Sequence, residues 1–417
     1  MAMIITKQIL RPSSPTPQAF KNHKLSYLDQ IQAPIYIPLL FFYKNEESKY
    51  PDQISQRFKQ SLSEILTIFY PLAGTMRHNS FVDCNDRGVE FVEVRVHARL
   101  AQFIQDPKME ELKQLIPVDC ISHTDDDFLL LVKISYFDCG EVVVGVCMSH
   151  KIGDGISLAA FMNAWAATCR GESSSEIIHP SFDLALHFPP KDHLSSASSF
   201  RVAIAQENIM TKRLVFDREK LEKLRKRIAA SSDGVRDPSR VEAVSVFIWK
   251  SLIEAHKAES HMTETPAVSI ASHAVNLRPR TVPQMDQTFG NCYAPASAVV
   301  SWDEDYVHHS RLRAALREID DDYINKVLKA DNNYLTQDQI GDLFKPENSV
   351  LSSWWRFPVY KVDFGWGKPV WVSTTTIQYM NLIIFTSTPS EDGIEAWVTT
   401  THNFFQVLQA NYNKLDT

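Results

Sequence analysis

The sequence predicts a protein of two α/β domains, and three of its features support this prediction. The chain of 417 residues is longer than a single hydrophobic core usually grows, so two domains of roughly 200 residues each are expected. Hydrophobic residues make up 44% of the sequence and aromatic residues 11%, which is enough for the whole chain to fold. Runs of β-branched residues alternate with helical patterns, as is typical of a mixed α/β fold.

The first half of the chain begins with an irregular segment and continues with helix and strand patterns. The prolines among residues 11–17 prevent a helix there, and residues 25–30 are expected to form a short capped turn. An amphipathic helix is expected at residues 53–68, because apolar side chains recur there at helical spacing. Strands are expected at residues 81–84, 89–95, 129–137 and 141–149.

A linker is expected at residues 186–200, where paired prolines and a serine cluster occur without periodicity. After it, a strand at residues 212–216 leads into a helix capped by Asp217, and a further helix covers residues 241–255. We therefore expect an N-terminal domain at residues 1–185, a crossover linker at 186–210 and a C-terminal domain at 211–417.

His150 is the residue most suggestive of chemistry, because it stands where an apolar strand breaks into a glycine-rich turn. Gly153 and Gly155 flank Asp154 in that turn, and a helical pattern follows. Catalytic and binding groups collect at such strand ends in α/β sheets, so a histidine there can act as a base. His-x-x-x-Asp alone is a weak pattern, however, and such a pair is more often structural than catalytic.

Other kinds of site have little support in the sequence. No second His or Cys lies near His150 at metal-ligand spacing, so no metal is expected. There is no Gly-x-Ser-x-Gly elbow, and Cys147 should point to the opposite face of its strand from His150. Neither a GxGxxG fingerprint nor a P-loop occurs, so nucleotide phosphates are not expected to bind in either of those ways.

Two further motifs lie in the second half of the chain. In residues 360–369, Asp363 precedes Trp366, which two glycines flank; alone, such a turn is more often a packed corner than a site. In residues 276–280, the guanidinium of Arg278 suits bidentate pairing with a buried carboxylate. The basic side chains of residues 220–227 favour a solvated helix face over a phosphate-binding patch.

Charge, hydropathy and cysteine spacing restrict the partners and the compartment. The net charge of −7, without a concentrated run of Lys and Arg, argues against a nucleic-acid partner. No segment reaches membrane-spanning length, and the first ten residues do not have the pattern of a signal peptide. The 6 cysteines are widely spaced, which favours free thiols in a reducing cytosol.

Taken together, the motifs resemble those of the BAHD family of plant acyl-CoA-dependent acyltransferases. That family is defined by HxxxD in mid-chain and DFGWG near the C-terminus, and His150 with Asp154 and residues 363–367 match both. The resemblance covers the whole chain, since residues 25–30, 70–74, 82–86 and 275–278 fall where family members carry similar segments. Residues 12–18 and 363–371 resemble a subgroup whose members mostly acetylate alkaloid hydroxyls.

The resemblance implies a fold, a pair of substrates and a cellular setting. It implies two similar α/β domains with mixed sheets, joined by a long crossover and enclosing an active-site tunnel, with His150 midway along it. The substrates would be an acyl-CoA, most simply acetyl-CoA, and a small-molecule alcohol acceptor, with no permanently bound cofactor. Neither nucleic acid nor membrane is an expected partner, and a cytoplasmic monomer is expected.

The resemblance also implies roles for individual residues. The Nε2 atom of His150 would remove the hydroxyl proton and return it to the CoA thiolate, without an acyl-enzyme. Trp366 would donate its indole N–H to the developing oxyanion, and Asp363 would organise the turn that sets Trp366. Asp154 would turn away from the tunnel and pair with Arg278. Basic groups of the second half, including Lys250 and those of residues 220–227, are the candidates for binding the CoA phosphates.

The leading hypothesis is therefore an alcohol O-acyltransferase that acetylates a plant alkaloid or a terpenoid-like alcohol. A hydroxycinnamoyl, benzoyl or branched-chain donor remains open, because the motifs do not report on the acyl pocket. A catalytically silent metabolite-binding protein and a thioesterase that uses the same base on water are the alternatives.

Overall fold

The structure is a computed structural model, and it describes residues 2–44, 51–119, 123–138, 140–173, 175–195, 209–231, 237–259, 268–302, 304, 308–328, 342–345 and 347–416. The chain forms two compact units. The first unit consists of Met1–Phe200, Asp286–Cys292 and Phe357–Thr376. The second consists of Arg201–Met285, Tyr293–Arg356 and Ile377–Thr417.

The two units are not continuous along the chain, whereas the sequence suggested one domain before residue 186 and one after residue 210. The first long segment of the chain ends within the expected linker, but two later segments belong to the first unit as well. Phe357–Thr376 does so because it carries strand β13 (Trp371–Ser373), which pairs with strand β3 (Tyr36–Tyr43). Asp363 and Trp366 therefore share a unit with His150.

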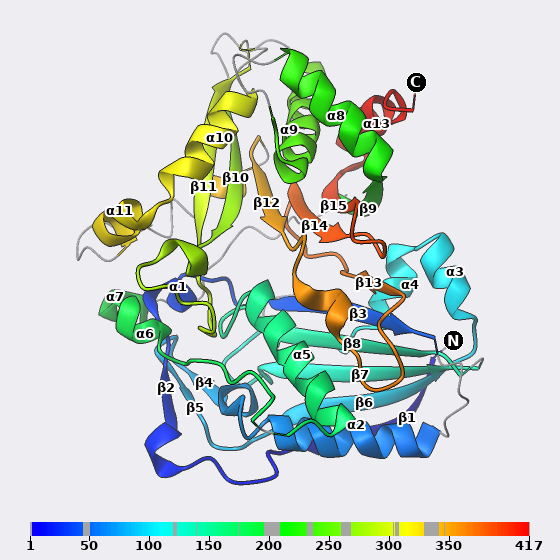
Figure 1. Cartoon of the computed structure of the whole chain (residues 1–417), viewed down its shortest axis with the longest axis vertical. Coiled ribbons are helices and arrows are strands. Elements are labelled where there is room, and N and C mark those ends of the chain that lie inside the picture. The colour runs from blue at the N-terminus through cyan, green and yellow to red at the C-terminus, as the bar shows by residue number, and fades with distance from the viewer. Residues whose placement is uncertain are drawn as a thin grey trace. The chain divides into compact units, whose positions relative to one another are not determined.

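A six-stranded mixed sheet forms the core of the first unit, in the order β1-β6-β7-β8-β3-β13 (Figure 1). Its other strands are β1 (Ala2–Leu10), β6 (Val89–Val96), β7 (Leu130–Phe137) and β8 (Val142–Ser149). β6 and β7 run parallel, and every other neighbouring pair is antiparallel. β3 and β8 are buried along their whole length, which explains their nearly continuous apolar sequences.

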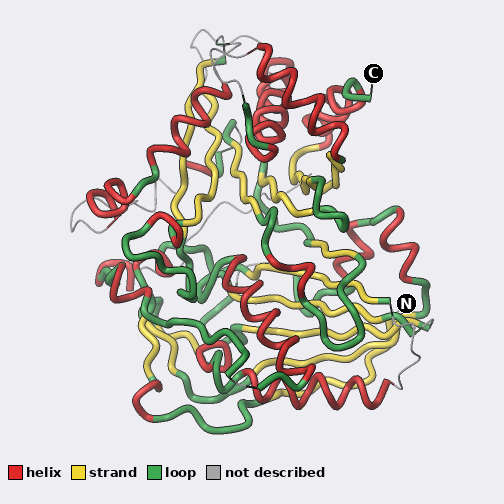
Figure 2. Tube along the Cα trace, viewed as in Figure 1, coloured by secondary structure: helices red, strands yellow, loops and turns green. Residues whose placement is uncertain are grey.

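Two long helices of the first unit, α2 (Pro51–Ile65) and α5 (Gly155–Arg170), lie over one face of this sheet (Figures 1 and 2). The indole N–H of Trp165 on α5 donates to Ser61 Oγ on α2 at 3.1 Å. Helix α5 ends at Gly171, whose φ of 82° is a backbone conformation that favours glycine. The two helices agree with the predicted helical patterns to within a few residues at each end.

Short elements complete the first unit. Strands β2 (Asn22–Lys24), β5 (Phe81–Asp83) and β4 (Thr75–Arg77) form a small sheet. The short helices are η1 (Gln18–Phe20), α1 (Tyr27–Gln30), η2 (Tyr70–Ala73), α3 (Leu100–Gln105), α4 (Met109–Lys113), α6 (Leu184–His187), α7 (Asp192–Ser195) and η5 (Pro358–Lys361). The expected linker thus contains short helices up to residue 195, and residues 196–208 lie outside the described part of the chain.

The second unit is also built on a six-stranded mixed sheet, in the order β11-β10-β12-β14-β15-β9. Its strands are β9 (Ile209–Phe216), β10 (Val268–Asn276), β11 (Tyr293–Ser301), β12 (Ser349–Ser353), β14 (Leu382–Ser387) and β15 (Ile394–Thr401). Its helices are α8 (Arg218–Ser231), α9 (Arg240–Glu259), η3 (Arg278–Arg280), α10 (His308–Glu318), α11 (Asp321–Tyr323), η4 (Ile324–Leu328) and α13 (His402–Asn413). Asp217 caps α8 as predicted, because its Oδ1 accepts from the backbone N–H of Lys220 at 2.8 Å.

The predicted α/β class with two mixed sheets is confirmed, since each unit contains one such sheet with helices packed against it (Figure 2). None of the helices in the described part of the chain is long and apolar enough to cross a membrane.

Candidate active site

His150 directly follows β8, at the end where β8 pairs with the first residue of β3. Ser149 lies opposite Tyr36 in the register of the two strands, and the backbone N–H of His150 donates to Ile35 O at 2.8 Å. The imidazole is partly exposed, while the five residues that follow it are buried. The strand and the turn therefore fix the backbone of His150 and leave its side chain reachable.

Asn291 fixes the orientation of the His150 ring. Its Nδ2 donates to His150 O at 2.7 Å and to Asp29 Oδ1 at 2.9 Å, and both of these atoms can only accept. The amide orientation is thereby set, and Oδ1 of Asn291 faces Nδ1 of His150 at 2.9 Å. Because an amide oxygen only accepts, His150 must carry its proton on Nδ1. The lone pair of a neutral His150 then lies on Nε2, where a base needs it.

Asp29 holds Asn291 in turn. Its Oδ1 accepts from the backbone N–H of Asn291 at 2.8 Å as well as from Nδ2, and its Oδ2 accepts from Ser26 N at 2.9 Å and from Ser26 Oγ at 2.6 Å. Ser26 and Asp29 form a capping box at the start of α1. Asp29 is 3% exposed and Asn291 is 0% exposed, so this hydrogen-bonded support of His150 is shielded from water.

Burial sets the protonation state of His150. Loss of hydration lowers the pKa of the imidazole below its usual value, and the positive charge of Lys151 acts in the same direction. The ring's own backbone carbonyl, Asp154 and Asn291 act against this, but burial is the largest effect. The ring is therefore neutral at pH 7, as a base must be.

Asp154 has a structural position. It is the N-cap of α5, where Oδ1 accepts from the backbone N–H of Ser157 at 2.9 Å. Its Oδ2 accepts from the backbone N–H of Cys292 at 3.1 Å, and Ser157 Oγ donates to Gly290 O at 2.9 Å. Asp154 thus ties α5 to the segment that carries Asn291. It influences His150 through its charge and through this segment.

The DFGWG motif forms a tight loop that Asp363 closes. Oδ1 of Asp363 accepts from the backbone N–H groups of Gly365 at 2.8 Å and Gly367 at 2.9 Å. Both glycines have φ near 100°, at 100° and 105°, which side-chain-bearing residues rarely adopt. The carbonyl of Asp363 accepts from Arg170 at the end of α5. Asp363 therefore closes the turn through hydrogen bonds to its backbone, and this turn lies in the first unit and not in the C-terminal domain where it was expected.

Trp366 packs against α2 and β3. Its ring lies 5.3 Å from that of Phe58 and 6.4 Å from that of Tyr43, with the Arg57 guanidinium 5.8 Å from its centroid. Among the residues that the structure describes, its buried Nε1 has no hydrogen-bond partner. These contacts place Trp366 in an aromatic cluster within the first unit.

The structure does not bring Trp366 to His150. His150 precedes the first residue of α5 while the DFGWG loop contacts Arg170 at the last one, and a 16-residue helix is about 24 Å long. Strand β8 gives a similar separation. Tyr43, which contacts Trp366, pairs with Val142 at the start of β8, and Ser149 lies seven residues further along this strand, next to His150. At about 3.4 Å per residue, these seven residues span about 24 Å. The geometry does not support the expected oxyanion role of Trp366. Both the DFGWG loop and the Trp366 ring make their contacts at the end of α5 that is distant from His150.

The remaining predicted residues belong to the second unit. Arg278 is buried at the start of η3, while its expected partner Asp154 is in the first unit, so their ion pair stays a prediction. Lys250 is partly exposed on α9. Within the basic face of α8, Lys220 pairs with Asp416 at 2.6 Å and Lys223 with Glu219 at 3.4 Å. These two cations are already neutralised within the unit.

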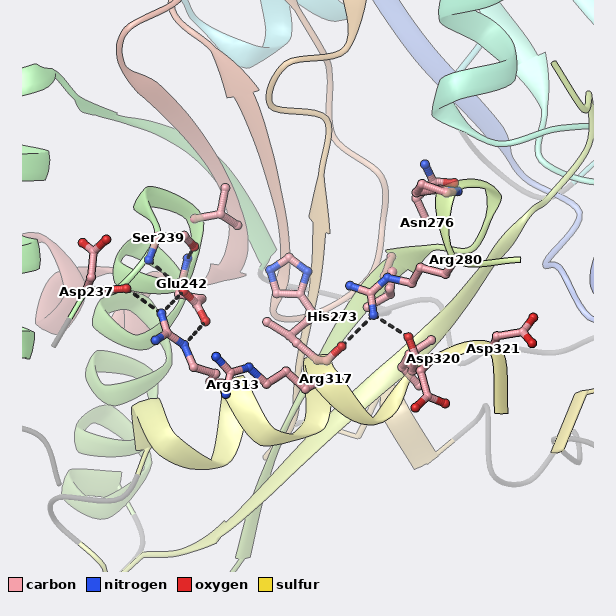
Figure 3. Close-up of a pocket in the computed structure, with 16 residues that line it drawn as sticks. Asp237, Ser239, Glu242, His273, Asn276, Arg280, Arg313, Arg317, Asp320 and Asp321 are labelled. Carbon is pink, nitrogen blue, oxygen red and sulfur yellow. Dashed lines mark hydrogen bonds and ion pairs between the residues drawn. The ribbon is translucent and has the colours of Figure 1, made fainter. Parts of the chain in front are cut away.

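A pocket of about 940 Å³ opens in the second unit between α9, α10 and the end of β10 (Figure 3). Arg313 lines it and forms two hydrogen bonds to the Glu242 carboxylate, at 2.8 and 2.7 Å. Arg280 also lines it and donates to Leu316 O at 2.8 Å. Arg317 also lines it and has no hydrogen bond or ion pair within the described part of the chain, and the carboxylates of Asp237, Glu242, Asp320 and Asp321 line the pocket as well. Arg317 is therefore a guanidinium of this pocket without a hydrogen-bond partner among the described residues.

Sequence reasoning singled out His150 and a capped turn at residues 25–30, but it did not connect Asn291 or Asp29 with His150. The capping box of Ser26 and Asp29 agrees with the predicted capped turn. Nothing in the sequence joins residue 291 to residue 150, because that contact depends on a segment that returns to the first unit from far along the chain.

Comparison with known proteins gives consistent matches over the whole chain. The Transferase family matches residues 1–415. Stemmadenine O-acetyltransferase of Catharanthus roseus is 41% identical over 422 residues, covering 99% of this chain and 97% of that protein. Vinorine synthase of Rauvolfia serpentina is 41% identical over 406 residues, covering 94% of this chain and 93% of that protein.

Solved structures agree with this relationship. The crystal structure of vinorine synthase matches with a TM-score of 0.85 at 38% identity, covering 100% of this chain and 98% of the other. F. graminearum TRI101, solved with coenzyme A and T-2 mycotoxin, has the same fold, with a TM-score of 0.70 at 17% identity and coverage of 94% and 98%. This chain belongs to the Transferase (BAHD) family and is an acyl-CoA-dependent alcohol O-acyltransferase.

Proposed function

We propose that the chain transfers an acetyl group from acetyl-CoA to a hydroxyl of a plant specialised metabolite, an alkaloid or a terpenoid-like alcohol, with His150 as the general base. The observation that carries this proposal is the buried support of His150: Asn291 holds the proton on Nδ1, and burial keeps the ring neutral. The acetyl donor and the alkaloid acceptor are supported by the 41% identity to stemmadenine O-acetyltransferase over 99% of the chain.

The reaction is a single displacement at the thioester carbonyl through a tetrahedral intermediate. As the acceptor oxygen bonds to the carbonyl carbon, Nε2 of His150 takes the hydroxyl proton. The C–S bond then breaks, and the same nitrogen returns the proton to the departing CoA sulfur. Asn291 accepts from Nδ1–H throughout and so stabilises the imidazolium that forms between the two proton transfers. No acyl-enzyme is needed, because the base acts on the acceptor directly.

The phosphates of acyl-CoA require cations that are not already neutralised. Lys220 and Lys223 on α8 have acidic partners, which argues against this helix as the phosphate site. Arg317 has no such partner among the described residues and lines a pocket large enough for part of a nucleotide. Arg317 is therefore our candidate for this role, whereas Lys250 on α9 is not among the residues that line this pocket.

The proposed setting is the cytosol. Cys84, Cys147, Cys169 and Cys292 are buried free thiols, which is the usual state in a reducing compartment. We also propose that the chain acts as a monomer.

The test is incubation of the purified protein with acetyl-CoA and stemmadenine, alongside a panel of alkaloid and limonoid alcohols. We expect a product heavier by one acetyl group in mass spectrometry and one CoA released for each product formed. CoA released without any acceptor would instead indicate a thioesterase. A His150→Ala variant that transfers acetyl at the wild-type rate would refute the assignment of the base.

A further inference from the structure

Lys151, the residue after His150, carries an ammonium group that is buried on the opposite side of the turn. Its Nζ donates to Gln30 O at 2.8 Å and to Gln32 O at 2.9 Å, and the residue is 6% exposed. Burying an amine is costly unless hydrogen bonds compensate for the lost hydration, and two backbone carbonyls do so here.

One of the two carbonyls belongs to Gln30, the last residue of α1, and the other to Gln32, two residues beyond it; α1 itself has only 4 residues. A single turn has no stability of its own in water, so its position depends on the contacts around it. Ser26 and Asp29 close the N-terminal end as a capping box. At the C-terminal end, Gln30 O accepts from Lys151 Nζ and, at 3.1 Å, from Asn79 Nδ2, while Gln32 O accepts from Lys151 Nζ.

These contacts form a closed circuit around the base. From Lys151 the circuit runs through Gln30 O into α1, and from Asp29 of α1 to Asn291. It then runs from Asn291 to Nδ1 of His150, and the chain itself joins His150 back to Lys151. A displacement of α1 would move the carboxylate that holds Asn291, and Asn291 would then lose its fixed orientation toward the ring.

The charge of Lys151 also affects the titratable groups around it. Burial lowers the pKa of Lys151 to about 7, while Asp29 and Asp125 act to raise it. Its charge lowers the pKa values of His150 and of His123, which lies behind Ser149 with its Nε2 2.7 Å from Ser149 Oγ. Asp154 opposes Lys151 at His150. In its protonated form, Lys151 therefore favours the neutral state of the base that it helps to hold.

We propose that Lys151 is a positioning residue for acyl transfer, one that clamps the end of α1 so that Asp29 and Asn291 keep the proton of His150 on Nδ1. This inference rests on the proposed function for its catalytic consequence. Its geometric content concerns the tautomer of His150, which can be measured without any substrate.

The experiment is nitrogen-15 NMR of the full chain labelled at histidine, in which ring nitrogen shifts report the tautomer. His150→Ala identifies the resonances of His150, and Asn291→Ala shows them without their acceptor. Lys151→Met removes the ammonium while keeping most of the aliphatic length. If that variant does not fold, Lys151→Gln is used, because its amide retains two donor hydrogens without the charge.

Lys133 provides a matched control. It is a partly buried lysine on β7 whose Nζ also donates to two carbonyls, Gln114 O at 2.6 Å and Ile116 O at 3.3 Å. Lys133 pairs with Gly145 in the register of β7 and β8, five residues or about 17 Å before His150. Lys133→Met removes the same chemistry from a place that does not touch α1.

In the wild-type protein and in Lys133→Met, we expect His150 to be neutral with its proton on Nδ1. In Lys151→Met, the His150 shifts should move at least half of the way to those of Asn291→Ala. Unchanged shifts in a folded Lys151→Met protein would overturn the proposal, as would an equal change in Lys133→Met. In Lys151→Gln, whose amide donors can keep the clamp, we expect a smaller change, and shifts equal to those of Asn291→Ala would overturn the proposal because they would show that the charge, and not the hydrogen bonds, holds the tautomer.

Turnover of acetyl-CoA with the acceptor found in the panel gives the second readout. Lys151→Met should lower kcat about tenfold with little change in KM, and less than about threefold when Asn291 is already alanine. A merely structural role would give the same loss in both backgrounds, which would refute positioning. If His150→Ala retains full turnover, the proposed function fails, while the NMR result still decides whether Lys151 holds the tautomer.

Discussion

Replacing Trp366 by phenylalanine separates a packing role of the DFGWG motif from a catalytic one. The indole ring contacts Phe58 at 5.3 Å and Phe364 at 5.9 Å, and its N–H has no partner among the described residues. Phenylalanine keeps a six-membered ring in these contacts and removes only the N–H and part of the ring area. The substitution therefore changes the packing only slightly and removes the hydrogen-bond donor completely.

The two interpretations predict effects of very different size. Removing one oxyanion donor lowers kcat by about 10²–10³, so a catalytic Trp366 would make the phenylalanine variant nearly inactive. A packing change at the far end of α5, a helix about 24 Å long, should leave kcat within about threefold of wild type, because distant sites contribute independently. The cost to the free energy of unfolding should be about 1 kcal/mol, as for other conservative core substitutions.

The assay is steady-state kcat for acetyl transfer, measured with urea denaturation of the same preparation. Trp366→Ala is the companion variant, and it should lose about 2–3 kcal/mol of stability, since a partly exposed tryptophan costs less to truncate than a buried one. A stable Trp366→Phe protein with kcat reduced a hundredfold would refute the geometric reasoning and restore the oxyanion role.

Four further predictions follow from the site. His150→Ala should lower kcat by about 10²–10⁴ without unfolding the protein. In the wild-type protein, kcat/KM should stay level down to about pH 6.5 and fall only at lower pH, because the lowered pKa of His150 keeps the imidazole neutral above that pH. Asn291→Ala should lower kcat about 10- to 100-fold, since the ring loses its fixed tautomer, and a variant with wild-type kcat would contradict this support. Asp154→Ala should cost about 2–4 kcal/mol in urea denaturation, through the lost cap and the unpaired N–H of Cys292, and Asp154→Asn should cost less. Arg317→Ala should raise KM for acetyl-CoA about tenfold, and Lys220→Ala should not, because Lys220 pairs with Asp416 whereas Arg317 has no acidic partner among the described residues; equal KM values would exclude the pocket as the phosphate site.

Local pattern predicted the elements of the fold well. The run ending at Ser149 reads as a strand buried on both faces, and β8 is buried along its whole length. The predicted cap at Asp217 is present as a hydrogen bond in the structure. Each of these features depends on residues within one turn or one strand, which is the range that periodicity and side-chain chemistry can report.

The division into units and the surroundings of His150 could not be predicted in this way. The segment Phe357–Thr376 returns to the first unit because β13 pairs with the edge of β3, and no local pattern at Trp371 reports which strand it joins. For the same reason Trp366, although it stands in a recognisable motif, was expected near His150 and lies at the other end of α5. A motif identifies residue types, whereas distance between two motifs is set by pairing across the sheet.

The support of His150 also explains how a base can be oriented without being protonated. A carboxylate bonded directly to Nδ1 orients an imidazole but also stabilises its charged form, which raises its pKa. Here the carboxylate of Asp29 is separated from the ring by the neutral amide of Asn291, and the ammonium of Lys151 acts in the opposite direction. Orientation is therefore retained while the electrostatic effect of the carboxylate is weakened.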